Sequence, residues 1–285
     1  MRAGPLAHPA PRAYGRRMTT RSLSLLGSLL ASFALVTTGL AGPAPAAPRT
    51  FVLDGLGDSY ASGYGVEPSF TTPCGRSGAA PAPSVDGRMR LVLDDFVACA
   101  GAKTTDLVPQ GQIAALGPDT DVVTLSIGGN DIGWSSAVTA CLGGTDVQCG
   151  GALTQTRSRI TSVLPGLLET TYDLVDAAAP RATVLVTGYP RLFSPEHGAV
   201  LGASPAEQVA LNDGADLLNA TIRTAAEAHG YTFVDVTERF VDHGVNAPEP
   251  WLIWPTSPGS FHPNALGYRS YAAAVTAAIR PSALR

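Results

Sequence analysis

Three short polar blocks, far apart in the sequence, hold the residue types that acyl transfer needs. Ser59 lies in a Gly-Asp-Ser-Tyr block at residues 57–60, Asn130 follows two glycines, and His262 begins a His-Pro-Asn block. A serine attacks an acyl carbon when a histidine takes its proton, and a side-chain amide can donate to the resulting oxyanion. Each block alone has an ordinary explanation, either a helix N-cap or a turn. Together, in this order, they predict nucleophilic chemistry at an acyl group.

Gly101, in the block at residues 100–105, is a further candidate donor, because a glycine lets a backbone N–H approach a substrate oxygen closely. Its ordinary explanation is a loop glycine with an unusual dihedral angle. The N–H groups of Ser59 and Gly101 and the Asn130 amide would make a three-donor oxyanion hole. Each donor in such a site contributes roughly 3 kcal/mol.

His262 is the candidate base among the four histidines that follow residue 46. It is on a short segment before Asn264, which can cap the following helix. His229 is at the predicted end of a helix, where a cation suits the helix dipole. His197 and His243 are in polar loops with no distinguishing context.

Predicted strands and helices, which must position these blocks, alternate along the chain. Short apolar runs rich in β-branched residues are typical of buried parallel strands, and the runs are residues 51–56, 121–127, 182–187 and 231–236, with a short strand at 96–98. Helical patterns cover residues 153–178, 206–228 and 265–279, and Pro165 divides the first. The alternation predicts an α/β sandwich with a mainly parallel sheet. Ligands bind beyond the carboxyl ends of such strands, where Ser59 and Asn130 fall.

The first 46 residues have the pattern of a signal peptide. Five arginines and no acid precede an apolar stretch at residues 23–40, and Ala44-Pro45-Ala46 offers a cleavage site. Met18 is an alternative start, which would make residues 1–17 an N-terminal extension. An uncleaved anchor is the other interpretation, but Ser, Thr and Gly dilute the apolar stretch. We expect export, with residues 47–285 forming one domain.

Composition and net charge limit the kinds of molecule that the protein is expected to bind. The chain has a net charge of −4, and without the five arginines of the leader it would carry −9. An acidic surface argues against nucleic acid or an anionic membrane as the main partner. With 45% hydrophobic and 15% charged residues, the chain can bury a sizeable core.

Four cysteines in an exported chain indicate disulfides, and three pairings are possible. The sequential pairing, Cys74 with Cys99 and Cys141 with Cys149, is favoured because each bridge closes a local loop. A metal site is the alternative, but no close cysteine pair and no neighbouring histidine supports one.

The blocks at residues 57–60, 101–105, 128–131 and 262–264 resemble the four blocks of the GDSL or SGNH hydrolase family. The resemblance runs from Phe51 to about Ile279. It implies a flavodoxin-like three-layer α/β/α domain of lipases and esterases, without a metal or organic cofactor. It also implies Ser59 as nucleophile, His262 as general base and then acid, and Ser59, Gly101 and Asn130 as oxyanion donors.

One position departs from the family pattern. Most members have an aspartate three residues before the histidine, where this chain has Gly259. In some similar secreted lipases and esterases a backbone carbonyl of this loop orients the imidazole instead. The carbonyl of Gly259 or Ser260 is therefore the candidate partner of His262 Nδ1, which predicts a Ser-His dyad.

The substrate is less well defined by the sequence. Trp134, Trp251 and Trp254 are near the Asn130 and His262 blocks, and either an acyl pocket or ordinary packing explains them. The chain is most similar to the secreted lipase and esterase branch, which implies carboxylic esters with medium or long acyl chains. Phospholipids, acetylated polysaccharides and thioesters stay open, as does a silent glycan- or lipid-binding module. We expect a monomer with at most transient contact with a lipid surface.

Overall fold

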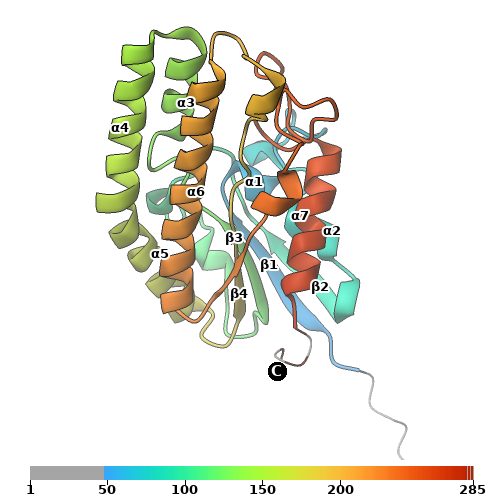
Figure 1. The fold of residues 1–285 in the computed structure, drawn as a ribbon. Helices are drawn as coiled ribbons and strands as arrows, with labels where there is room; N and C mark the ends of the chain where they lie inside the picture. The colour runs from blue at the N-terminus through green and yellow to red at the C-terminus, as the bar shows by residue number, and fades with distance from the viewer. Residues whose placement is uncertain (1–47, 281, 283, 285) are drawn as a thin grey trace, which may run out of the picture. The chain divides into compact units, whose positions relative to one another are not determined.

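Five parallel strands form one sheet in the order β2-β1-β3-β4-β5 in the computed structural model (Figure 1). The structure describes residues 48–280, 282 and 284. The strands are β1 (Phe51–Gly57), β2 (Leu91–Phe96), β3 (Val122–Ser126), β4 (Thr183–Thr187) and β5 (Thr232–Val234). Every residue of β3 is buried, as expected for a central strand covered on both faces. The predicted parallel α/β sheet is confirmed.

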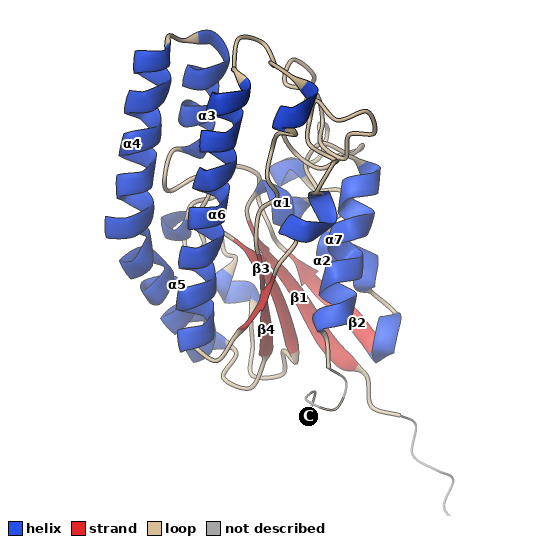
Figure 2. Cartoon of the chain, viewed as in Figure 1, coloured by secondary structure: helices blue, strands red, loops and turns tan. Residues whose placement is uncertain are grey.

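Helices cover both faces of the sheet and complete three layers (Figure 2). On one face α2 (Pro81–Val85) packs against α7 (Ala265–Ala278). On the other face α4 (Asp146–Ser162), α5 (Leu164–Ala178) and α6 (Pro205–Ala228) pack together, and α3 (Trp134–Gly143) packs on α4. The remaining helix, α1 (Ser59–Ser62), directly follows β1. The strand order and the layers are those of the predicted flavodoxin-like sandwich.

Two predicted elements differ from the structure. The helix expected over residues 153–178 begins earlier and is two helices, α4 and α5, with Val163 between them and Pro165 in the first turn of α5. The strand expected at residues 96–98 is wrong, because β2 ends at Phe96. The N–H groups of Val97 and Ala98 both donate to the Gly55 carbonyl, at 2.9 and 3.2 Å, so the regular ladder stops there.

The structure joins Cys74 to Cys99 and Cys141 to Cys149, and no described cysteine is free. The first bridge fastens the turn at residues 73–75 to the loop after β2. The second closes the connection between α3 and α4. Both bridges therefore brace segments at the carboxyl edge of the sheet.

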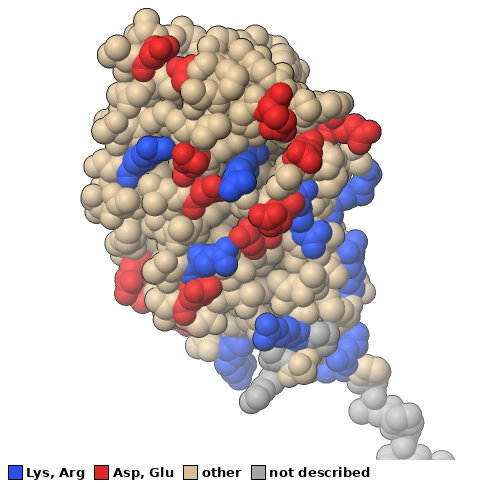
Figure 3. Space-filling model, in the orientation of Figure 1, with Lys and Arg blue, Asp and Glu red and all other residues tan. Residues whose placement is uncertain are grey.

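The charged side chains are arranged unevenly on the surface. Figure 3 shows acidic and basic side chains interleaved across the middle of one face, with basic side chains gathered at its lower edge, where β1 begins. At that amino edge Arg49 and Arg90 both lie over the ring of Phe51. The predicted signal peptide at residues 1–46 lies outside the described residues. Among the residues that are described, no helix has the length and apolar character needed to cross a bilayer.

Candidate active site

Ser59 is placed by a sharp turn between β1 and α1. Gly57 has φ +123°, and a Cβ there would come within 2.1 Å of the Ser126 carbonyl oxygen, so only glycine fits. The Asp58 N–H donates to that same carbonyl at 2.8 Å. The Asp58 side chain caps α1 by accepting from the Tyr60 N–H at 3.0 Å. Ser59 is thereby held as the first residue of α1, at the carboxyl edge of the sheet.

His262 comes from a segment that folds back over this turn. Residues 251–254 pair with residues 261–264, and Asn264 caps α7 by accepting from two backbone N–H groups. The Ser59 hydroxyl donates to His262 Nε2 at 2.7 Å. This is the contact that a nucleophile and its base require.

The other ring nitrogen of His262 faces only backbone. Among the described residues, its two hydrogen-bond partners are the carbonyls of Ser260 at 3.0 Å and Gly259 at 3.2 Å. A ring nitrogen between two carbonyl oxygens carries the proton, so Nε2 is free to accept one. The structure thus places both candidate carbonyls in contact with the imidazole.

Burial controls the charge of His262. The ring packs against Tyr60 and Tyr64, with centroids 5.0 Å away in both cases. Burial lowers the pKa of His262 to about 4, although its hydrogen bonds to the two carbonyls raise it. The imidazole is therefore neutral and ready to accept a proton near pH 7.

The three candidate oxyanion donors lie along one cleft. Ser59, Gly101 and Asn130 all line a cavity of about 760 Å³ at the carboxyl edge of the sheet. One N–H of the Asn130 amide donates to the Ala102 carbonyl at 2.9 Å, which fixes the amide and leaves its second N–H. No acceptor among the described residues is paired with the backbone N–H of Ser59 or Gly101.

Two contacts hold the loops of these donors. The Cys99 N–H donates to the Gly57 carbonyl at 2.9 Å, so the bridged loop before Gly101 is fastened to the end of β1. Thr104 donates to the Asp131 carboxylate through its hydroxyl at 2.6 Å. The Gly101 loop and the Asn130 loop are thus tied both to each other and to the serine turn.

The other histidines are away from the cleft. His229 ends α6 and its Nδ1 lies 2.9 Å from an Asp176 oxygen. His243 stacks on Trp251 with ring centroids 3.7 Å apart. His197 lies 3.5 Å from the Glu196 carboxylate. None of the three lines the cavity, so His262 is the histidine that the structure brings to Ser59.

The three tryptophans have different surroundings. Trp134, at the start of α3, lines the cleft and packs on Gly214, where a Cβ would come within 2.9 Å of its ring. Trp251 packs between His243 and Phe240. Trp254 is exposed. Of the three candidates for an acyl pocket, only Trp134 lies in the wall of the cleft.

Sequence reasoning missed two residues of this site. The Gln112 side-chain amide pairs with the backbone of Gly57, accepting from its N–H at 2.7 Å and donating to its carbonyl at 3.1 Å. Tyr189 lines the cleft and contacts both Asp58 and Gly129. No local pattern marks Gln112. Tyr189 follows the predicted strand at residues 182–187, at the edge where ligands bind, so the strand rule could have found it.

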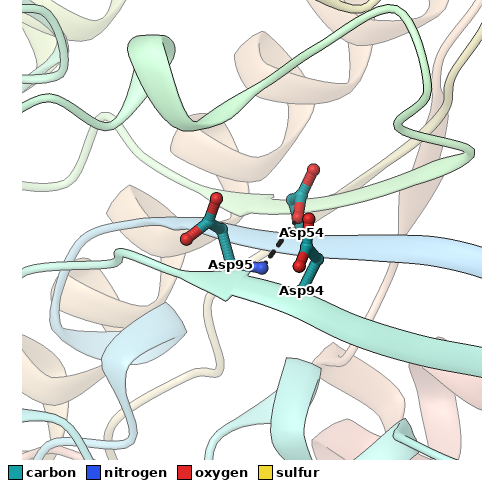
Figure 4. Close-up of side chains that lie close together, drawn as sticks. All are labelled: Asp54, Asp94 and Asp95. Atoms are coloured by element: carbon teal, nitrogen blue, oxygen red, sulfur yellow. Dashed lines mark hydrogen bonds between the residues drawn. The ribbon is translucent and has the colours of Figure 1, made fainter.

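An acidic cluster lies apart from the cleft. Asp54 on β1 is close to Asp94 and Asp95 on β2, with their carboxylate oxygens within 4.8 Å of one another (Figure 4). Asp54 accepts from the Asp95 N–H at 3.0 Å and from the Thr120 hydroxyl at 2.7 Å. Both oxygens of this buried carboxyl therefore already have protein donors, and burial raises its pKa. The contacts explain Asp54 as a link between neighbouring strands.

A serine and a histidine in contact at the carboxyl edge of a parallel sheet are the arrangement of a serine ester hydrolase. The chain belongs to the GDSL-like lipase/acylhydrolase family, whose family model matches residues 56–270. As a member of this family it is a carboxylic ester hydrolase of the lipase and esterase type.

Relatives from Streptomyces are similar over most of the chain. A lipase of Streptomyces rimosus is 35% identical over 258 residues, 88% of this chain and 94% of that one. Lipase 1 of Streptomyces coelicolor is also 35% identical, covering 87% of this chain and 94% of the relative. The crystal structure of phospholipase A1 from Streptomyces albidoflavus has a TM-score of 0.75 and 34% identity, covering 81% of this chain and 100% of that one.

The pH dependence of the activity should report the half-buried imidazole of His262. Because a histidine can act as a base only when it is neutral, kcat/KM is expected to stay high down to about pH 5 and to fall as the pH drops through about 4, the pKa of His262. A pH profile of kcat/KM with a soluble ester measures this. An acid limb near pH 6.5, where an exposed imidazole titrates, would contradict it if that limb persists when Asp58 is replaced by asparagine.

Asp58 is a second titratable group next to Ser59, so its titration must be separated from that of His262 in the same experiment. Burial raises the pKa of Asp58 to about 6, although hydrogen bonds from Tyr189 and Tyr60 lower it. The Asp58→Asn variant removes this titration. An acid limb near pH 4 that persists in this variant is assigned to His262.

Proposed function

We propose that the protein is a secreted lipase or carboxylesterase that acts through an acyl-enzyme formed on Ser59, with His262 as the only side-chain partner of the serine hydroxyl among the described residues. The observation that carries the proposal is the 2.7 Å contact between Ser59 Oγ and His262 Nε2, together with two carbonyls at Nδ1. Backbone carbonyls fix the tautomer as a carboxylate would, although they stabilise the imidazolium less.

The reaction proceeds in two halves. Ser59 Oγ attacks the ester carbonyl carbon while its proton passes to His262 Nε2, and the tetrahedral oxyanion forms. His262 then gives that proton to the alcohol oxygen as the bond from this oxygen to the acyl carbon breaks. In the second half water attacks the acyl-enzyme, its proton passes to Nε2, and the acid leaves as Ser59 regains a proton.

The oxyanion would be held by the N–H groups of Ser59 and Gly101 and the free N–H of the Asn130 amide. Their location on one cleft and the absence of a described acceptor for the two backbone groups support this role. Donors already fixed in place need no reorganisation as charge develops, which is why such sites are effective.

The cleft favours esters with a medium or long acyl chain. Beyond the serine, its walls are mainly apolar side chains of α3, α6 and the loop after β4. They are Trp134, Val138, Leu142, Leu192, Leu201 and Leu218. A cavity of about 760 Å³ is large for an acetyl group and within the range of roughly 300–1,000 Å³ typical of small-molecule sites. The phospholipase A1 and the lipases among the relatives are consistent with such substrates.

Export is supported by two features. The signal-peptide pattern precedes the domain, and two disulfides with no free described cysteine suit an oxidising compartment. A relative, the lipase of Streptomyces rimosus, is described as extracellular.

A panel of p-nitrophenyl esters from acetate to palmitate tests the substrate class. We expect kcat/KM to rise from acetate to octanoate by up to about fourfold per methylene, since each buried CH₂ contributes about 0.8 kcal/mol. The Ser59→Ala variant gives the background rate. Highest activity on acetate, with activity on acetylated xylan, would instead assign the protein to the acetyl esterases.

Labelling with a fluorophosphonate tests the nucleophile directly. The wild-type protein should take up one label, on the peptide that contains Ser59, as read by mass spectrometry. His262→Ala should slow this labelling strongly. If the protein neither labels nor hydrolyses any ester, the proposed mechanism is refuted.

A further inference from the structure

The hydroxyl of Tyr189 joins two loops that carry the proposed oxyanion donors. It donates to Asp58 Oδ2 at 2.5 Å and accepts from the Gly129 N–H at 3.2 Å. Asp58 immediately precedes Ser59, and Gly129 immediately precedes Asn130. Tyr189 therefore connects, through one oxygen atom, the residue before the nucleophile with the residue before the amide donor.

The Asp58 side chain links Tyr189 to the turn that carries Ser59. Asp58 is 1% exposed, and its Oδ1 accepts from the Tyr60 N–H at 3.0 Å, at the start of α1. Each oxygen of the carboxylate thus has a different donor, one on α1 and one on Tyr189. A movement of Asp58 would change the direction in which the Ser59 N–H points.

Tyr189 itself is fixed by α6, by the ring of Tyr60 and by the backbone at Gly129. The buried Asn219 on α6 accepts from the Tyr189 N–H and donates to the Tyr189 carbonyl, both at 2.8 Å. The Tyr189 ring meets the ring of Tyr60 edge to face at 5.1 Å. It also lies so close to Gly129 that a Cβ there would be 3.2 Å from its Cζ. The phenol is held on three sides and can serve as a rigid reference point.

We propose that Tyr189 is a positioning residue, which sets the distance between the Ser59 N–H and the Asn130 amide by holding Asp58 and Gly129 with one hydroxyl group. This inference rests on the proposed function, in which those two groups bind the oxyanion. Donors are effective only at about 2.7–3.1 Å from the oxyanion, and a displacement of about 1 Å can cost about 100-fold in rate.

Removal of the hydroxyl alone is the appropriate test. Tyr189→Phe keeps the ring and the wall of the cleft, but leaves the buried Asp58 Oδ2 and the Gly129 N–H without this partner. We expect kcat for p-nitrophenyl octanoate to fall by about 10- to 100-fold, with KM within about twofold of the wild type. The rate of fluorophosphonate labelling of Ser59 should fall by a similar factor, since that reaction uses the same donors.

Tyr231 provides a matched control in the same protein. Its buried ring also donates a hydroxyl proton to an aspartate, Asp176 Oδ1, at 2.6 Å, and it does not line the cleft. Tyr231→Phe should lower Tm while kcat stays within about twofold of the wild type, since it displaces no oxyanion donor. A general loss of stability is thereby separated from a loss of positioning.

If Tyr189→Phe does not fold, Asp58→Asn tests the same link. Tyr60 and Tyr189 donate to different oxygens of the carboxylate, and an amide has an oxygen at only one of those two positions, so both donations cannot persist in the same geometry. We therefore expect kcat to fall again while KM is kept. Unchanged kcat in a folded Tyr189→Phe or Asp58→Asn variant overturns the inference, as does a rise in KM alone. Activity that survives Ser59→Ala would instead refute the proposed function, so the two failures are distinguishable.

Discussion

Replacement of His262 by alanine is expected to lower kcat by at least about 10⁴-fold, because no other described titratable side chain is within hydrogen-bond distance of the Ser59 hydroxyl. Without a base the serine remains protonated at pH 7 and is a poor nucleophile. Steady-state kinetics on p-nitrophenyl octanoate, with circular dichroism to show that the variant is folded, measures the effect.

His243 is the matched control for that variant. It is also an aromatic ring packed against another ring, with its Nδ1 2.8 Å from the Glu249 carbonyl, but it is outside the cleft. His243→Ala should keep kcat within about twofold, since surface substitutions away from a site have small effects. If His262→Ala retained a tenth of the activity, another group would have to be the base.

The Asn130→Ala variant is expected to lower kcat by about 10²- to 10³-fold, or about 2.7–4 kcal/mol of transition-state stabilisation. KM should change little, because the free N–H of this amide would meet full negative charge only in the transition state. The other N–H of the Asn130 amide donates to the Ala102 carbonyl at 2.9 Å, so some loss of Tm accompanies the change.

Asn246→Ala separates these two effects. The Asn246 amide donates to the Ser194 carbonyl at 2.8 Å and to the Gly198 carbonyl at 3.1 Å, and it does not line the cleft. The Asn246→Ala variant should lower Tm with little change in kcat. A large rise in KM in Asn130→Ala, without a fall in kcat, would assign Asn130 to substrate binding rather than to the oxyanion.

The sequence predicted the parts of the fold that depend on local pattern. β3 and β4 are short β-branched runs between turns, and Asn130, which was predicted to lie beyond the carboxyl end of β3, lines the cleft. The early end of β2 follows from a register shift next to Gly55, which the alternation of residues does not record. α3 was missed as well, since it is a short helix that begins after a glycine turn without a side-chain cap.

The prediction of the site residues was limited in a similar way. Ser59, Asn130 and His262 are each in a distinctive short block, but Gln112 acts on the Gly57 backbone from 55 residues away. Such a contact depends on where the loop after β2 returns to the sheet. The role that we infer for Tyr189 likewise depends on a strand order that brings β1, β3 and β4 side by side.

The loop whose backbone carbonyls contact His262 Nδ1 is also restricted in the substitutions that it can accept. Gly259 has φ +79°, and a Cβ at that position would lie 2.7 Å from the Gly65 Cα. An aspartate installed there would be strained in its backbone and would collide with another chain segment. A single substitution at this site therefore offers no route from the proposed dyad to a triad with an acid at residue 259. The whole loop would have to be rebuilt to bring a carboxylate to His262. Substitutions that adapt the activity of this enzyme are therefore expected elsewhere in the cleft.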